Sequence, residues 1–429
     1  MPKLALLGGS PVSKKTFPPY NSIGREETVA VLKVMESKAL SDFVGRAGQY
    51  FLGGRRVKEL EKRFCDYFGV KYAVSFNSAS TALQAAVGAL GIGPGDEVIT
   101  TPFTMSATAS AILYNNALPV FADISESDFC INPEKIEKLI NKKTKAVIVT
   151  NLFGGPADYK GILKICKKHN LKLIEDNAQS PGASYKGKFA GTIGDIGVFS
   201  FNFHKVIQSG EGGILATNNR KYAFRAQLVR NHGEAIVDDL SRQGKIYEPI
   251  LGNNFRLTEL QAAIAIKQLN KLKKLNRQRI ILAEYLSKKL EQFSWLSAPR
   301  NSRGNAHVYY VYPFKFLPES IGIKRETFVR AMQAEGFALS QGYQKPIYLF
   351  PAYQKKQIYP GSQFPFVSKE YPHKINYGKG ICPVAEKMYE KELLITEICR
   401  PPQTKKDIDM FVKAIEKIEQ NIDELKKYD

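Results

Sequence analysis

A lysine beside a glycine-rich turn is the residue of this chain with the clearest capacity for chemistry. Lys205 closes the segment SFNFHK at 200–205, at the exit of the apolar run 196–201, and GEGG follows at 210–213. A lysine in a desolvated pocket has a lowered pKa and becomes an amine nucleophile. Because an isolated lysine is more often a solvated surface residue, its companions in the sequence decide between the two interpretations.

Two further segments could serve a cofactor that carries a ring nitrogen and a phosphate. Asp176 lies at the end of the apolar run KLIEDN at 172–177, where its carboxylate is either an ion-pair partner for a pyridinium nitrogen or a helix cap or turn acid. Opposite charges about 4 Å apart at an effective dielectric of about 20 attract by roughly 4 kcal/mol, or about three pKa units. That attraction would keep a pyridine ring protonated and an effective electron sink.

The turn NSASTA at 77–82 opens a helix directly after an apolar run. Such a turn aims backbone N–H groups and hydroxyls at a phosphate, although an ordinary serine N-cap has the same sequence. The sequence leaves both interpretations open.

These segments lie at strand ends in a predicted α/β layer. Short apolar runs alternate with helical spacing, which is typical of a largely parallel sheet between helices. Ligands bind where the strands of open α/β sheets end. The predicted strands are 72–76, 96–101, 118–124, 145–150, 172–177, 196–201 and 213–217, and the predicted crossover helices are 80–90, 133–140 and 161–169.

The pattern changes in the second half of the chain. A helical pattern runs from Leu257 to about Leu290, and it is followed by an aromatic β-type run at 307–316, a Pro/Tyr-rich region at 343–372 and a closing helix from about 405 to 425. We expect an N-terminal arm at 1–25, a large cofactor-binding domain at 26–275 and a smaller α+β domain at 276–429.

Composition limits the class of protein. The 429 residues are 44% hydrophobic, enough for a substantial core in each of two domains, and the net charge of +21 favours an anionic partner. The densest basic stretch has helical spacing and is expected to form one solvated helix face. Its members are Lys267, Lys271, Lys273, Lys274, Arg277 and Arg279.

Cysteine usage and apolar runs indicate the compartment. The five cysteines show neither CxxC pairing nor metal-ligand spacing, so no disulfide framework and no metal site is expected, and a reducing compartment fits. No run approaches the roughly 18 apolar residues of a membrane span. We therefore expect a cytoplasmic protein without a membrane partner.

Taken in order, these motifs resemble the DegT/DnrJ/EryC1/StrS family of pyridoxal 5′-phosphate (PLP)-dependent sugar aminotransferases, which are fold-type I, aspartate aminotransferase-like enzymes. The resemblance covers nearly the whole chain, and its most specific stretch is SF-xxx-K-xxxx-GEGG at 200–213. The other matching segments are LALLGG at 4–9, GPGDEVI at 93–99, EDNAQS at 175–180, GDIG at 194–197 and GNNFRLTELQAA at 252–263. The implied fold is an α/β large domain with a mostly parallel seven-stranded sheet and a smaller α+β C-terminal domain.

The resemblance also implies roles for single residues. Lys205 would form the Schiff base (aldimine) with PLP and shuttle protons, Asp176 would pair with the pyridinium nitrogen, and Gln179 would donate a hydrogen bond to the phenolic oxygen of the cofactor. Phe103 would stack on the ring. The phosphate would be bound by Ala79, Ser80 and Ser200, and by Asn254 of a neighbouring subunit, which implies an obligate homodimer with shared active sites.

Some positions depart from the family pattern. Ala79 and Ser80 stand where Gly-Thr is common, and Asn177 stands where a small residue is usual, but the backbone and hydroxyl donors remain. A sugar-deoxygenating branch of the family has histidine in place of the lysine, and His204 is adjacent. The spacing from Ser200 and from Gly210 assigns the position to Lys205.

The expected function is transfer of an amino group from L-glutamate or L-glutamine to a keto-sugar, through a pyridoxamine 5′-phosphate form of the cofactor. The resemblance implies that the keto-sugar is nucleotide-linked. A keto-cyclitol or amino-shikimate-type substrate is the alternative within the family, since 346–348 and 383–386 resemble segments of those relatives. A basic nucleic-acid-binding or regulatory protein on the same fold is the alternative from another class. No nucleic-acid-binding motif is present, so no nucleic acid partner is expected. His307 and Tyr343 lie in segments that resemble the substrate side and are assigned no role.

Overall fold

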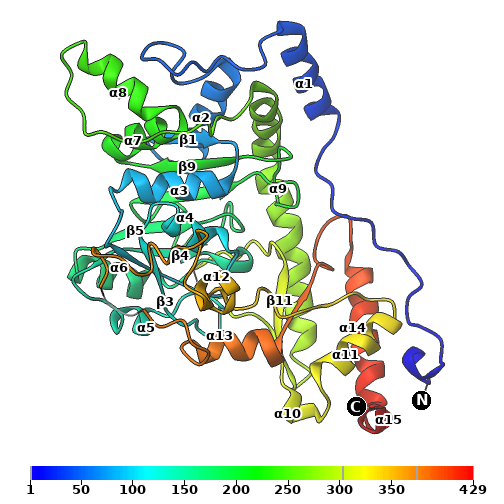
Figure 1. Ribbon diagram of the computed structural model, residues 1–429. Coiled ribbons are helices and arrows are strands. Elements are labelled where there is room, and N and C mark those ends of the chain that lie inside the picture. Colours follow the sequence, from blue (N-terminus) through cyan, green and yellow to red (C-terminus); the bar gives the residue numbers. More distant parts are fainter. Residues whose placement is uncertain (1, 302–303, 373–374, 429) are drawn as a thin grey trace.

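The computed structural model describes residues 2–301, 304–372 and 375–428. Met1 of the predicted arm, and residues 302–303, 373–374 and 429 of the predicted small domain, lie outside the described residues. A seven-stranded sheet with helices around it occupies one part of the molecule, and a four-stranded sheet with its own helices occupies the other. The long helix α9 (Glu259–Leu290) runs between the two parts (Figure 1).

The large sheet is parallel except for one strand. Its order is β1-β9-β8-β5-β4-β2-β3, and β9 (Gly213–Thr217) runs antiparallel to both neighbours. The prediction of a mostly parallel seven-stranded sheet is confirmed. Because helices bury both faces of the sheet, the sequences of its strands are nearly continuous apolar runs. The other six are β1 (Tyr72–Phe76), β2 (Glu97–Thr100), β3 (Leu118–Phe121), β4 (Thr144–Thr150), β5 (Lys172–Asp176) and β8 (Ile196–Ser200), and the hairpin β6 (Ser184–Tyr185) and β7 (Lys188–Phe189) stands apart.

Side-chain caps set where the crossover helices begin. Ser78 accepts a hydrogen bond from the backbone N–H of Thr81 at the start of α3, and Asn132 accepts one from Glu134 at the start of α5. The three predicted crossover helices are confirmed, with ends shifted by a few residues. The helices of this part are α1 (Arg25–Ser37), α2 (Arg55–Phe68), α3 (Ala79–Ala89), α4 (Ala107–Leu113), α5 (Pro133–Glu137), α6 (Tyr159–Lys168), α7 (Arg220–Arg230) and α8 (Gly233–Ser241).

The smaller sheet is antiparallel, in the order β10-β11-β13-β12. The predicted strand at 307–316 is shorter than expected, because Tyr309 has a left-handed backbone (φ 49°) and donates its N–H to Nδ1 of His307. The predicted closing helix is interrupted at Asn421. The elements are β10 (Leu296–Ser297), β11 (Tyr312–Phe316), β12 (Ser340–Gln341), β13 (Leu393–Thr396), α10 (Pro318–Ile321), α11 (Arg325–Ala334), α14 (Lys405–Gln420) and α15 (Ile422–Tyr428).

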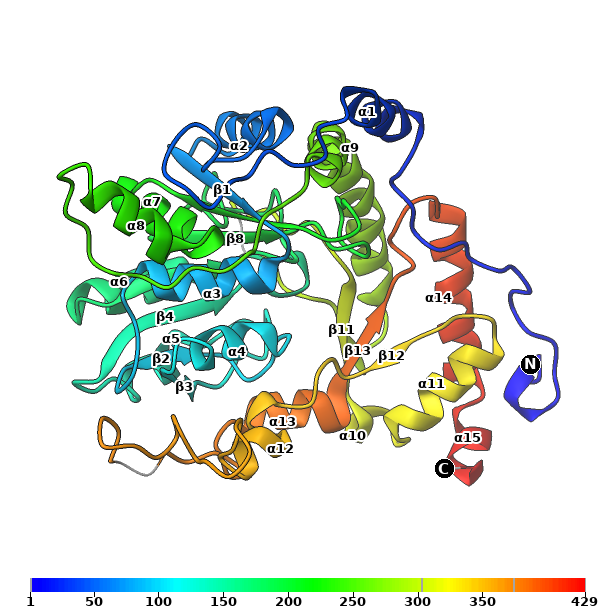
Figure 2. The same cartoon turned by 45° about the horizontal axis from the view of Figure 1, so that its top comes forward.

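Two segments cross the predicted domain boundaries. Helix α9 runs unbroken through the boundary at 275/276. The Pro/Tyr-rich region returns to the large sheet, where the Tyr371 hydroxyl donates to Glu97 of β2 (2.5 Å) and the Tyr377 hydroxyl donates to the carbonyl of Pro119 in β3 (2.9 Å). This region, with α12 (Pro351–Gln354) and α13 (Pro383–Lys387), lies along the β2 and β3 side of the sheet (Figure 2). The division into domains stays a prediction.

The basic stretch of α9 does not form one solvated face. Lys273 and Arg277 are exposed, but Arg279 is completely buried (0%) and donates a hydrogen bond to the carbonyl of Tyr310. The prediction is wrong for Arg279, because helical spacing does not reveal contacts with Tyr20 and Tyr310, which lie far from it in the sequence. Among the residues that the structure describes, no helix has both the length and the apolar character needed to cross a bilayer.

A buried carboxylate joins β5 to the loop that leads into β8. Glu175 is completely buried and accepts hydrogen bonds from the backbone N–H groups of Gly191 (2.6 Å), Ile193 (2.6 Å) and Gly194 (2.5 Å). The Tyr159 hydroxyl also donates to it. Burial raises the pKa of Glu175, and these hydrogen bonds oppose that rise. The carboxylate therefore fixes the start of the strand that carries Ser200.

Replacing this carboxylate should destabilise the fold. We expect Glu175→Gln to lower the free energy of unfolding by about 2–4 kcal/mol, because one amide oxygen replaces two charged acceptors and leaves buried N–H groups unpaired. Urea unfolding followed by circular dichroism measures the change. Glu284→Gln on the exposed side of α9 is the matched control and should change stability by no more than about 0.5 kcal/mol. Equal stability of the two variants would contradict the assignment.

Candidate active site

The ends of β1 and β8 meet at one edge of the large sheet. Ser200, the last residue of β8, pairs with Gly213 of β9, and a Cβ atom on Gly213 would lie only 2.5 Å from the backbone nitrogen of Ala79. The close approach brings Ser200 beside the first turn of α3, where Ser80 is exposed. First-turn N–H groups lack helical partners and attract anions. The geometry fits a phosphate held by α3 and Ser200.

Lys205 lies in the turn after β8. Its side chain is half-buried, so one part of it reaches the surface and the rest packs against the protein. Its Nζ atom lies 4.8 Å from the centroid of the Tyr310 ring. Burial lowers the pKa of Lys205 to about 8; the negative charge of Asp176 opposes this shift, and the positive charge of Arg400 adds to it. A usable fraction of the amine is therefore unprotonated at mildly alkaline pH.

Asp176 is buried at the end of β5. Its carboxylate accepts hydrogen bonds from the Thr108 hydroxyl (2.7 Å) and from the backbone N–H of Ala178 (3.1 Å). Burial raises the pKa of Asp176 in spite of these bonds and of the attraction of Lys205. A buried carboxylate with only neutral hydrogen-bond donors gains most from a cationic partner. The protonated ring nitrogen of PLP is such a partner, so the residues present fit this cofactor.

Gln179 and Phe103 lie under Tyr343. The Gln179 side chain accepts from the backbone N–H of Phe153 (2.9 Å) and donates to the Tyr343 hydroxyl (2.8 Å). The Phe103 ring is completely buried and meets the edge of Tyr343 with centroids 6.0 Å apart. The stacking of Phe103 on the cofactor ring stays a prediction. Met105, two residues after Phe103, has an exposed side chain.

Asn254 lies at the surface near the first turn of α3. Asn254 forms an isolated antiparallel β-bridge with Asn231. The carbonyl of the next residue, Phe255, accepts a hydrogen bond from the backbone N–H of Asn77 (2.9 Å). Its exposed side chain is free to face a second molecule. The role of Asn254 in a neighbouring subunit stays a prediction.

Tyr310 and Arg400 lie near the lysine although the sequence did not single them out, and Arg279, which was expected on a solvated helix face, bonds to the same tyrosine. Nη1 of Arg279 (3.2 Å) and Nε of Arg400 (3.1 Å) both donate to the carbonyl oxygen of Tyr310, whose ring faces Lys205. They come from α9 and from the segment after β13. No local pattern links these positions, so only the tertiary fold brings them together.

His204 is exposed beside the lysine. Burial of its ring lowers the pKa of His204 to about 4, and the positive charge of Lys205 adds to the lowering. The imidazole is therefore neutral at physiological pH. Its ring centroid lies 6.3 Å from that of Tyr310, so the lysine has the closer contact with this ring.

Comparison with known proteins gives the same family as the motifs. The sequence profile of the DegT/DnrJ/EryC1/StrS aminotransferase family matches residues 33–396. The chain is 31% identical to an L-glutamine:2-deoxy-scyllo-inosose aminotransferase of Streptoalloteichus tenebrarius over 399 residues, which cover 90% of each protein. It is 35% identical to a GDP-perosamine synthase of Caulobacter vibrioides over 301 residues, 70% of this chain and 79% of that protein.

A solved structure agrees with these sequence matches. The crystal structure of an aminotransferase from Psychrobacter cryohalolentis superposes with a TM-score of 0.81 at 29% identity, over 95% of this chain and 100% of that chain. The predicted fold type, enzyme class and PLP cofactor are confirmed.

The amine of Lys205 should titrate early in the cofactor-free protein. We expect its rate of labelling by trinitrobenzenesulfonate to follow a pKa of about 8. Asp176→Asn should lower that pKa further, because the substitution removes the negative charge that stabilises the ammonium form. Peptide mass spectrometry between about pH 6 and pH 10 measures the rate, with the exposed Lys188 as internal reference. Labelling of both lysines with one pH profile would contradict the assignment.

Proposed function

The chain belongs to the DegT/DnrJ/EryC1/StrS aminotransferase family, and we propose that it transfers the amino group of L-glutamate or L-glutamine to the ketone of a nucleotide-linked sugar. The observation that carries the proposal is the position of Lys205 and Asp176. Both side chains lie among interior groups at neighbouring strand ends, next to a helix N-terminus suited to a phosphate. A lysine with a lowered pKa whose charge interacts with that of a buried carboxylate requires a chemical reason.

The chain supplies proton transfer and orientation. PLP, when bound, supplies the electron sink that makes the α-proton of an amino acid removable. We assign to Lys205 the attachment of the cofactor and the transfer of that proton, because its amine is in part unprotonated. Asp176 would keep the ring nitrogen protonated. Ala79, Ser80 and Ser200 would bind the phosphate.

Aromatic side chains would shield the reacting atoms from water. Tyr310 and Tyr343 are mostly buried, and the fully buried Phe103 lies beneath Tyr343. Exclusion of water strengthens the attraction between a carboxylate and a ring cation, because the local dielectric falls. These three rings therefore support the pairing that we assign to Asp176.

The relatives support two classes of ketone. The GDP-perosamine synthase is named for a GDP-linked product, and the net charge of +21 is compatible with a diphosphate. The L-glutamine:2-deoxy-scyllo-inosose aminotransferase, matched over 90% of both chains, favours a keto-cyclitol as the second candidate and glutamine as the donor. The keto-cyclitol candidate therefore rests on the name of that relative.

A homodimer with shared active sites is part of the proposal. Asn254 is exposed, and large apolar side chains are exposed on α1 and after α8. A second copy of the chain would remove this apolar surface from water. The exposed apolar residues are Val29, Leu32, Met35, Ile246 and Leu251.

The absorption spectrum tests the cofactor, the lysine and the donor together. We expect purified protein loaded with PLP to show a visible band that L-glutamate or L-glutamine shifts to the near ultraviolet. Lys205→Ala should lose covalent PLP, detected by borohydride reduction and peptide mass spectrometry, and turnover should fall by about 1000-fold or more. Lys188→Ala, at an exposed position, is the matched control and should keep both.

Assays of the same PLP-loaded protein with different ketones identify the class of acceptor substrate. Turnover of nucleotide-linked keto-sugars is expected, and turnover of inososes alone would assign the second candidate instead. Absence of any PLP spectrum after reconstitution would overturn the proposed function.

A further inference from the structure

The turn that carries Lys205 lacks the hydrogen-bond ladder of a regular element. Every residue from Ser200, which ends β8, to Gly213, which begins β9, is described, and none between them lies in a helix or strand. Within the turn, the backbone N–H of Lys205 donates to the carbonyl of Asn202 (2.9 Å). A segment outside helices and sheets is held by the groups that bond to its backbone. The position of the lysine therefore depends on contacts from other parts of the chain.

Two hydrogen bonds join this turn to segments that are distant in the sequence. The hydroxyl of Tyr20 donates to the carbonyl oxygen of Val206 (2.6 Å), the residue after Lys205. The backbone N–H of Gln208 donates to Oε1 of Gln268 on α9 (3.3 Å). Val206 is completely buried, so water cannot readily replace the tyrosine hydroxyl. The bond from Tyr20 is the shorter of the two and lies closer to the lysine.

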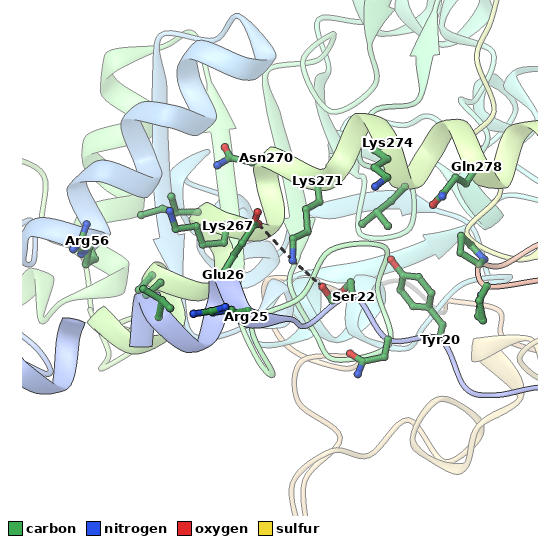
Figure 3. A pocket seen from close by; sticks show the side chains of 18 of the residues that line it. Tyr20, Ser22, Arg25, Glu26, Arg56, Lys267, Asn270, Lys271, Lys274 and Gln278 are labelled. Carbon is green, nitrogen blue, oxygen red and sulfur yellow. Dashed lines mark hydrogen bonds and ion pairs between the residues drawn. The ribbon is translucent and has the colours of Figure 1, made fainter. Parts of the chain in front are cut away.

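Tyr20 itself is placed by contacts on both sides of it in the N-terminal segment. Before it, Nζ of Lys15 pairs with the largely buried Asp407 of α14 (2.5 Å). After it, the hydroxyl of Ser22 donates to Gln268 (2.6 Å), the same buried side chain that accepts from the turn. Figure 3 shows Tyr20 and Ser22 on this segment, beside α9. These contacts fix the path of the segment that delivers the Tyr20 hydroxyl to the turn.

A second series of contacts leads from Tyr20 to the lysine. The guanidinium carbon of Arg279 lies 4.3 Å from the centroid of the Tyr20 ring. Nη1 of Arg279 donates to the carbonyl of Tyr310 (3.2 Å), and the Tyr310 ring centroid lies 4.8 Å from Nζ of Lys205. Because Arg279 is completely buried, its attraction to the Tyr20 ring is stronger than it would be in water. Tyr20 therefore contacts both the backbone beside the lysine and the arginine that bonds to Tyr310.

Tyr20 also borders the groove between α1 and α9, which has a volume of about 1010 Å³. The lysines of α9 that line this groove are Lys267, Lys271 and Lys274. The side chain of Tyr20 is half-buried beside this open space, so loss of its hydroxyl leaves no enclosed cavity. Replacement by phenylalanine can therefore remove the hydrogen bond while the ring stays against Arg279.

We propose that Tyr20 is a positioning residue for Lys205, an inference that rests on the proposed function. Its hydroxyl holds the carbonyl of Val206 and thereby keeps the lysine turn packed against the interior. Tyr20 acts through the turn and through Arg279, not on a reacting atom. Burial lowers the pKa of Lys205 to about 8, so a turn released from Tyr20 would admit water and weaken this effect.

The variant Tyr20→Phe tests the hydroxyl. In the cofactor-free protein, trinitrobenzenesulfonate labelling of Lys205 should follow a pKa above 8, closer to the ordinary lysine value of about 10.4, because the amine becomes better hydrated. In the PLP-loaded protein, the rate at which saturating L-glutamate or L-glutamine shifts the visible band should fall by about tenfold, since the amine is displaced from the proton that it must move. The donor concentration at half-saturation should change by no more than about twofold. Peptide mass spectrometry and stopped-flow absorption measure these effects.

Tyr285→Phe is the matched control, because it removes the hydroxyl of another half-buried tyrosine, which donates to Asp409 of α14 (2.7 Å). It should leave the labelling profile unchanged and the rate of the band shift within about twofold. Circular dichroism and urea unfolding confirm that both variants are folded. Equal changes in the two variants would overturn the inference. A Tyr20→Phe protein that is less stable but keeps the wild-type labelling profile and rate would overturn it too, since the bond would then be structural only.

Failure of this inference can be told from failure of the proposed function. If the wild-type protein carries PLP on Lys205 and reacts with the donor, but Tyr20→Phe behaves in the same way, only the role of Tyr20 is removed. If the wild-type protein shows no PLP chemistry, the proposed function is removed. The labelling profile of the cofactor-free protein would still decide whether Tyr20 holds the lysine turn.

Discussion

Three backbone N–H groups converge on the buried carboxylate of Glu175, and the arrangement of the site depends on this contact. The bonded loop leads directly into β8, so the contact fixes where β8 begins beside β5. Ser200 and Lys205 follow from β8, whereas Asp176 is the next residue after Glu175. Because side chains alternate along a strand, one carboxylate faces the interior support and its neighbour faces the site.

The site holds more positive than negative charge. Lys205, Arg279 and Arg400 surround Tyr310, and Asp176 is the carboxylate that attracts the lysine. Burial lowers the pKa of the amine, and the positive charge of Arg400 adds to the lowering. The excess of cations makes this part of the molecule attractive to anionic ligands. The groove between α1 and α9 is also lined by more cationic than anionic side chains.

Local patterns predicted the parts of this structure that short-range physics controls. The seven strands, the caps at Ser78 and Asn132 and the turn of Lys205 follow from apolar runs and nearby side chains. The burial of Arg279 was not predictable, because the residues that it contacts, Tyr20 and Tyr310, are distant in the sequence. The return of the Pro/Tyr-rich region to β2 and β3 likewise depends on distant tyrosine contacts with Glu97 and Pro119.

The groove and the reacting residues come from separate parts of the chain. Lys205 and Asp176 lie at strand ends, whereas Lys267 and Lys274 lie on one helix with no ion-pair partner in the described residues. Substitutions on that helix surface need not disturb the packing of the strands. During evolution, drift can therefore change the charge of that helix surface while purifying selection preserves the residues at the strand ends.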